Sequence, residues 1–140
     1  MPVRSASATW NGGLKAGKGS FKTESGLAAN YNFGSRFGEE RASNPEELLA
    51  AAEAACYSMA LSAALEKNGT PGTSVEAQGK CTIEKLGYGF TITSIALSVR
   101  VSAPGLDDAT LQKLAEETKK GCPVSRALAG TKIEVKATRA

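Results

Sequence analysis

The chain has 140 residues, which is long enough for one domain with a substantial hydrophobic core. Apolar residues make up 41% of it and charged residues 22%, as in ordinary globular proteins. The net charge of +3 arises from basic and acidic residues scattered along the chain, with no basic run and no interleaving of aromatic with basic side chains. We therefore predict a single domain over residues 1–140 and no nucleic acid as a partner.

The cysteine count and the absence of histidine limit the kinds of disulfide and metal site that the chain can form. Three cysteines without a CxxC pair argue against a disulfide scaffold. A zinc site is not expected, because the chain has no histidine and its cysteines are not spaced as zinc ligands. We predict no metal and no cofactor. The first ten residues lack the apolar core of a signal peptide, and Glu53 and Glu66 interrupt the longest apolar run, so we expect a cytoplasmic protein with no membrane span.

The N-terminal third predicts short strands and loops. Residues 5–25 suggest two strands joined at the turn-forming triplet Asn11-Gly12-Gly13. Residues 26–43 are rich in Gly, Asn and Ser, and we interpret them as a loop with one further strand around NYNFGSRF (30–37).

A long helix beginning at Pro45 is the best-marked element. Asn44 is a favourable N-cap, Pro45 suits the first helical position, and Glu47 falls at the capping-box position. With a stop at Asn68-Gly69 the helix has about 23 residues and a length of roughly 34 Å. We expect it to be buried on several sides, with a broad face formed by Leu48, Leu49, Ala52, Ala55, Cys56, Met59, Ala60 and Ala63.

The C-terminal half predicts strands at 74–86 and 90–103, helices at 104–121 and from Pro123, and a final edge strand at 131–140. The alternation of apolar residues changes parity in the second strand, which indicates a bulge near Thr93-Ser94. The order of strands, helix, strands, helices and strand indicates the α+β class.

Two cysteines, 66 residues apart, are the candidate reactive groups. Cys122 precedes Pro123 and so occupies a helix N-cap, where free N–H groups favour the thiolate, although a cysteine can also cap a helix without chemistry. Cys56 lies in the middle of the helix among small residues. Burial there raises the pKa of a thiol unless a cation is close. The alternative to a reactive Cys56 is a cysteine that only fills space in the core. Candidate cations include Arg36, Arg41 and Arg126. Cys81, in a strand, is interpreted as structural.

Three acids near the long helix differ in position. Glu47 is expected to cap the helix N-terminus, whereas Glu46 is available for another role. The alternative for Glu46 is a surface acid that only complements the helix dipole, which is common at a helix start. Glu53 lies one helical turn before Cys56, where its charge opposes thiolate formation unless it points away.

Taken together, NPEELLAAAEAACYSMALS, YNFGSRF and GCPVSRAL resemble the OsmC/Ohr family of osmotically inducible and organic hydroperoxide resistance proteins, with the OsmC branch the nearer one. The resemblance implies an intertwined α+β homodimer with a long buried central helix packed on mixed β-sheets. It implies a thiol-dependent peroxidase that reduces organic hydroperoxides, hydrogen peroxide less well, in oxidative or osmotic stress. By similarity the reductant is a dithiol such as a protein-bound lipoyl group.

The same resemblance assigns roles to individual residues. Cys56 matches the peroxidatic cysteine and Cys122 the resolving cysteine, which together form a disulfide in the catalytic cycle. Arg36 matches the arginine that stabilises the thiolate, and Glu46 matches the carboxylate that holds this arginine. Cys81 and Glu53 have no role in the family pattern.

Helix geometry adds a prediction about the assembly. Glu46 and Cys56 are ten residues apart, so on a straight helix they are separated by about 15 Å along the axis. An arginine bonded to Glu46 cannot easily reach Cys56 of the same helix. We expect Arg36 and Glu46 of one chain to serve Cys56 of its partner, with the two long helices antiparallel.

Other functions remain to be weighed against a peroxidase. The first is a non-enzymatic dimeric stress protein that binds a small apolar ligand and keeps its cysteines as core residues. A hydrolase or acyl transferase with a cysteine nucleophile is disfavoured, because the chain has no histidine to act as base.

Overall fold

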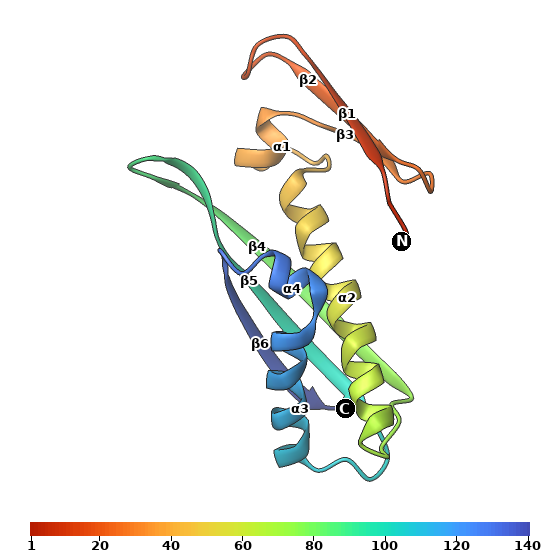
Figure 1. The fold of residues 1–140 in the computed structure, drawn as a ribbon. Helices are drawn as coiled ribbons and strands as arrows, with labels where there is room; N and C mark the ends of the chain where they lie inside the picture. Colours follow the sequence, from red (N-terminus) through yellow and green to blue (C-terminus); the bar gives the residue numbers. More distant parts are fainter. The chain divides into compact units, whose positions relative to one another are not determined.

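Three short antiparallel strands form the first sheet of the computed structural model, which describes all residues 1–140. They are β1 (Ala6–Asn11), β2 (Lys18–Thr23) and β3 (Ala28–Tyr31), in the order β1-β2-β3. The predicted pair of strands is confirmed, and Gly12 turns the chain after β1 with a positive φ of 92°. This sheet, drawn in red and orange in Figure 1, belongs to the first of two units, Met1–Glu47 and Leu48–Ala140.

A short helix, α1 (Phe33–Phe37), follows the first sheet. The prediction of a strand around residues 30–37 is therefore correct only as far as Tyr31. The reason is a capping box: the Asn32 side chain accepts a hydrogen bond from the backbone N–H of Ser35 at 2.8 Å, and the Ser35 hydroxyl accepts one from the N–H of Asn32 at 3.0 Å. These two bonds begin a helix where the sequence pattern alone suggested an extended segment.

The long helix α2 (Pro45–Lys67) begins and ends as predicted. The Asn44 side chain accepts a hydrogen bond from the N–H of Glu47 at 2.8 Å, which confirms the N-cap. The second half of the predicted capping box is absent, because the Glu47 carboxylate instead accepts a hydrogen bond from the Ser43 hydroxyl at 2.6 Å.

One side of α2 is buried and the opposite side is exposed. The buried stripe repeats every three or four residues and consists of Ala50, Glu53, Tyr57, Leu61 and Leu65. The exposed side is also apolar, with Ala51, Ala52, Ala55, Met59 and Ala63. The prediction of a helix buried on several sides is wrong for one chain, because only the stripe with Tyr57, Leu61 and Leu65 faces the core, while Met59 and most of the alanines lie outside it.

The second sheet is mixed and has the order β4-β5-β6. Strands β4 (Ser74–Leu86) and β5 (Gly89–Ser102) are antiparallel, and β6 (Lys132–Arg139) runs parallel to β5 at the edge. Ser94 pairs with Thr82 and Ile92 with Ile83, so Thr93 is the extra residue of a bulge. The predicted bulge and the predicted edge strand are both confirmed.

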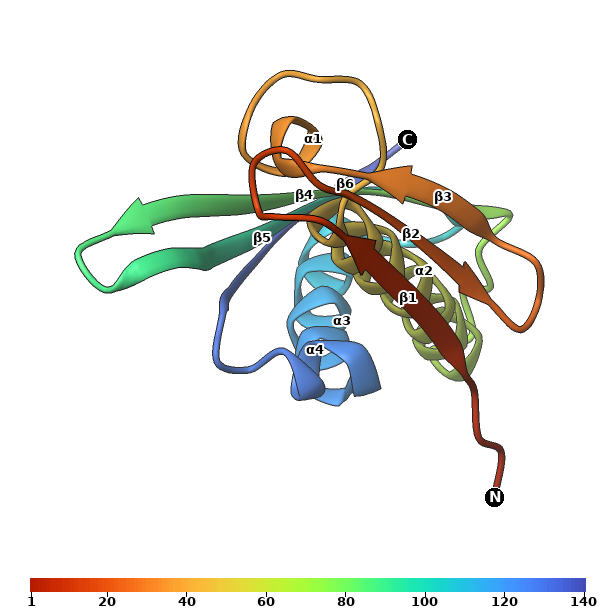
Figure 2. The ribbon, with the colours of Figure 1, turned by 90° about the horizontal axis from the view of Figure 1, so that it is seen from above.

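Helices α3 (Asp108–Gly121) and α4 (Pro123–Ala127) connect the parallel strands β5 and β6. Figures 1 and 2 show α2 and α3 side by side on one face of the second sheet. The Tyr57 hydroxyl donates a 2.7 Å hydrogen bond to the carbonyl of Ala115 and so joins α2 to α3. The core between these layers contains Tyr57, Leu61, Leu65, Leu97, Val99, Val101, Leu106, Leu111, Leu114, Ala115 and Ala137. The predicted α+β class is confirmed.

By length and composition alone α2 would suffice to cross a membrane, since its most apolar window has a mean hydropathy of 1.5. The prediction that Glu53 and Glu66 make the apolar run too short for a membrane span is therefore wrong by this criterion. Core helices of soluble proteins meet the same criterion, and 28% of this window is buried. The wholly buried Glu53 carboxylate, hydrogen bonded to Ser125 of α4, is typical of a helix packed against protein.

A close approach between α2 and β4 gives a prediction for stability. A Cβ added at Gly79 would lie 2.7 Å from the carbonyl oxygen of Ala50, and neither backbone can move freely. We expect Gly79→Ala to lower the free energy of unfolding by about 1–3 kcal/mol, measured by urea denaturation. Gly87→Ala on the same hairpin is the control, because an added Cβ there meets nothing within 4 Å. Equal stability of the two variants would contradict this packing.

Candidate active site

The sulfur atoms of Cys56 and Cys122 lie 3.0 Å apart. Cys56 lies in the middle of α2 and Cys122 occupies the single residue between α3 and α4, so the packing of these helices brings the two thiols together. The separation is longer than a disulfide bond of about 2.05 Å, and both cysteines are free thiols. Because Cys122 is fully buried and Cys56 only half-buried, Cys56 is the more accessible of the two.

Cys122 stands at the N-cap of α4, followed by Pro123 at the first helical position, as the sequence predicts. Burial opposes its ionisation, but the hydrogen bond with Cys56 and the backbone N–H of Ser125 outweigh burial and lower the pKa of Cys122. The Ser125 hydroxyl and the N–H of Val124 act in the same direction. The helix start therefore makes the Cys122 thiol easier to deprotonate.

Cys56 has the opposite environment within this chain. Burial raises its pKa, and so do the hydrogen bond with Cys122 and the negative charge of Glu53, while the N–H of Val124 opposes them. This direction is the one predicted for a mid-helix thiol without a nearby cation. A nucleophilic Cys56 needs a positive charge in addition to the groups of its own unit.

Glu53 is a part of this site to which the sequence assigned no role. It is 0% exposed, and its Oε1 accepts a hydrogen bond from the hydroxyl of Ser125, which is also buried. Its Oε2 is buried without a hydrogen-bond partner. The one-turn spacing indicated that Glu53 lies near Cys56. Its partner Ser125 is 72 residues away in the chain, and no local sequence pattern predicts that hydrogen bond.

The first unit contains an ion pair between Arg36 of α1 and Glu46 in the first turn of α2. The Arg36 Nε donates to Glu46 Oε1 at 2.9 Å, and the guanidinium carbon lies 5.1 Å from the centre of the Phe37 ring. Glu46 is 5% exposed, and its second oxygen, Oε2, has no partner. One free carboxylate oxygen and a partly exposed guanidinium leave this pair able to bind a further group.

Arg36 also lines an aromatic pocket of the first unit. The pocket has a volume of about 250 Å³ and is lined by Trp10, Leu14, Tyr31, Asn32, Phe33, Arg36 and Phe37. Neighbouring rings pack at centroid distances of 5.6 Å for Trp10 and Tyr31 and 5.0 Å for Phe33 and Phe37. A guanidinium at the edge of an apolar pocket can bind a polar group that carries an apolar substituent.

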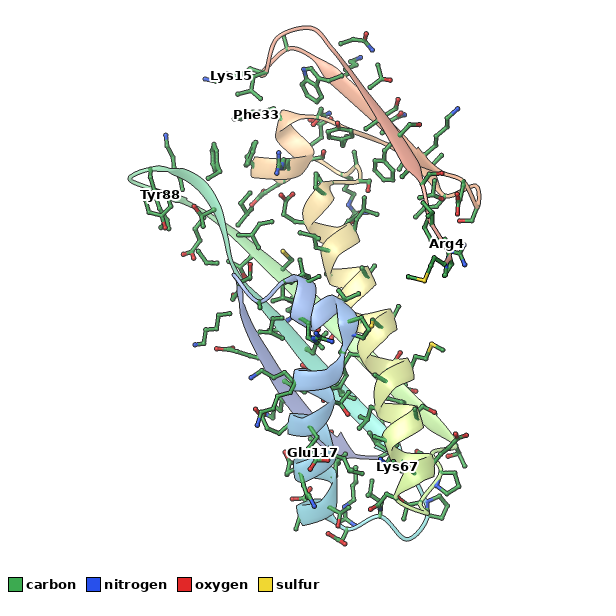
Figure 3. The ribbon with its side chains drawn as sticks, in the orientation of Figure 1. Arg4, Lys15, Phe33, Lys67, Tyr88 and Glu117 are labelled. Atoms are coloured by element: carbon green, nitrogen blue, oxygen red, sulfur yellow. The ribbon has the colours of Figure 1, made fainter.

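An open groove between α2 and α3 leads to Cys122. It has a volume of about 580 Å³, and Lys67 of α2 and Glu117 of α3, both labelled in Figure 3, are among its lining residues. Its apolar lining includes Ala60, Ala63, Ala64 and Leu114. The small side chains of α2 therefore leave room for an apolar molecule beside Cys122.

The remaining cysteine, Cys81, lies half-buried on β4. It forms no disulfide bond, and no group of three or more His, Cys, Asp or Glu side chains is arranged to hold a metal ion.

Comparison with known proteins gives a consistent result. The family model described as OsmC-like protein matches residues 38–137. The chain is 45% identical to peroxiredoxin OsmC of Escherichia coli over 123 residues, 86% of each chain. It is 37% identical over 99 residues to an organic hydroperoxide resistance protein of Xanthomonas axonopodis, 69% of this chain and 66% of the relative. The crystal structure of an organic hydroperoxide resistance protein from Elizabethkingia anophelis superposes with a TM-score of 0.72 at 28% identity, covering 99% of this chain and 97% of that one.

Proposed function

Because the chain belongs to the OsmC family, we propose that it is a thiol-dependent peroxidase that reduces organic hydroperoxides during oxidative or osmotic stress. The observation that carries this proposal is the 3.0 Å separation of the Cys56 and Cys122 sulfur atoms. Two thiols at this distance can form a disulfide with a small movement of the side chains. A protein that merely binds an apolar ligand does not require such a pair.

The proposed cycle has three steps. The Cys56 thiolate attacks the distal oxygen of the hydroperoxide, which releases an alcohol and leaves a sulfenic acid on Cys56. Cys122 then attacks that sulfur, which gives the Cys56–Cys122 disulfide and water. A dithiol, such as a lipoyl group on another protein, reduces the disulfide by exchange and restores both thiols.

The charge that activates Cys56 is proposed to come from Arg36, held by Glu46 of the same chain. Within its own unit the pKa of Cys56 is raised by burial, by Cys122 and by Glu53. A nearby cation has to offset these effects if Cys56 is to be a thiolate. Glu46 and Cys56 lie about 15 Å apart along α2, so an arginine bonded to Glu46 serves Cys56 more easily in a neighbouring chain. Each complete site therefore combines the cysteines of one chain with Arg36 and Glu46 of its partner.

The exposed apolar side of α2 supports this assembly. Ala51, Ala52, Ala55, Met59 and Ala63 all face solvent in one chain, and the Met59 side chain is 78% exposed. A continuous apolar face on the longest helix is typical of a surface that another subunit covers. Small residues on this face allow two antiparallel copies of α2 to approach closely in an intertwined homodimer.

The surroundings of the reactive groups favour hydroperoxides with an apolar substituent. The groove that leads to Cys122 and the pocket beside Arg36 are both lined in part by apolar side chains. An alkyl or aryl group gains free energy by leaving water for such surfaces, whereas hydrogen peroxide does not. Hydrogen peroxide is therefore expected to be the poorer substrate.

The setting of this chemistry is proposed to be the cytoplasm, where thiols are kept reduced between turnovers. We also infer that residues 1–140 act as one OsmC-like domain, since the family match at residues 38–137 spans the boundary between the two units.

Cysteine variants test the proposed function. Cys56→Ser removes the attacking thiolate, so we expect no turnover of cumene hydroperoxide. Cys122→Ser leaves the first step intact, so we expect one rapid equivalent of alcohol. In excess hydroperoxide a second, slower equivalent should follow as Cys56 is over-oxidised to the sulfinic acid, detected by mass spectrometry. Cys81→Ser is the control and retains activity. Wild-type turnover by Cys56→Ser would exclude the proposal.

Mixed dimers test the shared site. Arg36→Ala raises the pKa of Cys56 and slows the reaction at neutral pH, and Cys56→Ser is inactive by itself. When the two variants are unfolded together and refolded in equal amounts, about half of the dimers are mixed and each has one complete site, so about a quarter of the wild-type activity returns. If Arg36 served Cys56 of its own chain, no site in the mixed dimer would be complete and activity would stay at the level of the separate variants.

A further inference from the structure

A buried carboxyl group and a buried hydroxyl group lie beside the sulfur pair and have no part in the cycle described so far. Glu53 of α2 is 0% exposed and Ser125 of α4 is 4% exposed. The Ser125 hydroxyl donates a hydrogen bond to Glu53 Oε1, and Glu53 Oε2 is buried without a partner. A buried acid with one unpaired oxygen lowers stability compared with an apolar residue of the same size. Such a group calls for a functional explanation.

The position of each residue relates it to one of the two thiols. Glu53 precedes Cys56 by one turn of α2. Ser125 is the third residue of α4, whose N-cap is Cys122, and its hydroxyl and backbone N–H both contribute to lowering the pKa of the Cys122 thiol. The Ser125 hydroxyl therefore connects the Glu53 carboxyl group with the neighbourhood of the Cys122 sulfur.

We propose that Glu53 and Ser125 form a proton relay that serves Cys122 when the disulfide closes. The inference rests on the proposed peroxidase function and adds two proton-carrying residues to it. Glu53 receives the Cys122 proton through Ser125 and returns it to the leaving hydroxide. The direction of the observed hydrogen bond suits this task, because a hydroxyl that donates to the carboxylate has its lone pairs available for the proton of a thiol.

The step balances within the chain. The Cys122 thiol passes its proton to the Ser125 oxygen while the Ser125 proton moves to Glu53 Oε1. The sulfur electron pair of Cys122 forms the S–S bond to Cys56, and the S–O bond of the sulfenic acid breaks with its electron pair on oxygen. The Glu53 carboxylic acid then gives its proton to the departing hydroxide, so that water leaves and the carboxylate is restored. Cys122 is oxidised, the sulfenic sulfur is reduced, and no outside reagent is required.

The electrostatics of the site agree with this assignment. The Ser125 hydroxyl contributes to lowering the pKa of Cys122, as expected when it donates to the thiolate after the proton has moved to Glu53. The Glu53 charge contributes to raising the pKa of Cys56. Tyr57 on α2 is a further titratable group nearby: burial, the Glu116 charge on α3 and the Cys122 and Glu53 charges all raise its pKa. Glu53 therefore opposes ionisation of Cys56, which slows the attack on the peroxide, but assists deprotonation of Cys122, which speeds closure of the disulfide.

Glu53→Gln and Ser125→Ala test the relay in rapid-quench experiments with cumene hydroperoxide on the full-length protein. Alcohol release reports the oxidation of Cys56, and the Cys56–Cys122 disulfide, counted by mass spectrometry after acid quench, reports the closing step. Glu53→Gln keeps the shape and the hydrogen bond to Ser125 but cannot carry the proton. We expect alcohol release to be unchanged or faster in this variant, and disulfide formation to slow about 100-fold with accumulation of sulfinic acid on Cys56.

Matched variants separate this role from a structural one. Ser125→Ala should slow closure as Glu53→Gln does, whereas Ser125→Thr keeps a hydroxyl and should retain most of the wild-type rate. Glu116→Gln removes a neighbouring acid outside the relay and should leave both steps unchanged. The relay is excluded if Glu53→Gln closes its disulfide at the wild-type rate, or if both steps slow by the same factor. Absence of alcohol and disulfide in the wild-type protein would instead exclude the peroxidase function itself.

Discussion

The approach of the Cys56 and Cys122 sulfur atoms to 3.0 Å depends on how tightly α2 packs against α3 and α4. A hydrogen bond from Tyr57 to the Ala115 carbonyl fixes the two longer helices, and the apolar core lies between these helices and the second sheet. Gly79 lets the backbone of β4 approach Ala50 of α2. Each of these contacts holds the mid-helix thiol opposite the N-terminus of α4, so the chemistry of the site is a consequence of core packing.

The two thiols differ because the backbone around them differs. Cys122 meets the unpaired N–H groups that every helix leaves at its start, and these lower its pKa. Cys56 meets only the interior of a helix, burial and a carboxylate, which raise its pKa. One chain thus prepares the thiol that closes the disulfide but does not by itself prepare the thiol that attacks the peroxide. This asymmetry supports the proposal of a dimer in which Arg36 and Glu46 of one subunit complete the site of the other.

Much of this arrangement could be predicted from local sequence. Asn44 and Pro45 predicted the start of α2, the change of parity predicted the bulge at Thr93, and Cys122 before Pro123 predicted the N-cap. Other features were missed. The Asn32 and Ser35 capping box turned an expected strand into α1, and the buried face of α2 was misassigned because alanine is apolar on every side of the helix. The Glu53–Ser125 pair joins residues 72 apart, and only the packed structure reveals it.

The most direct test of the account counts thiols in the wild-type protein before and after one equivalent of cumene hydroperoxide, with peptide mapping of the product. Two of the three thiols per chain are expected to disappear, and a Cys56-to-Cys122 cross-linked peptide is expected to be recovered, with Cys81 still reduced. Loss of fewer than two thiols, or oxidation at Cys81 in place of the Cys56–Cys122 pair, would contradict it.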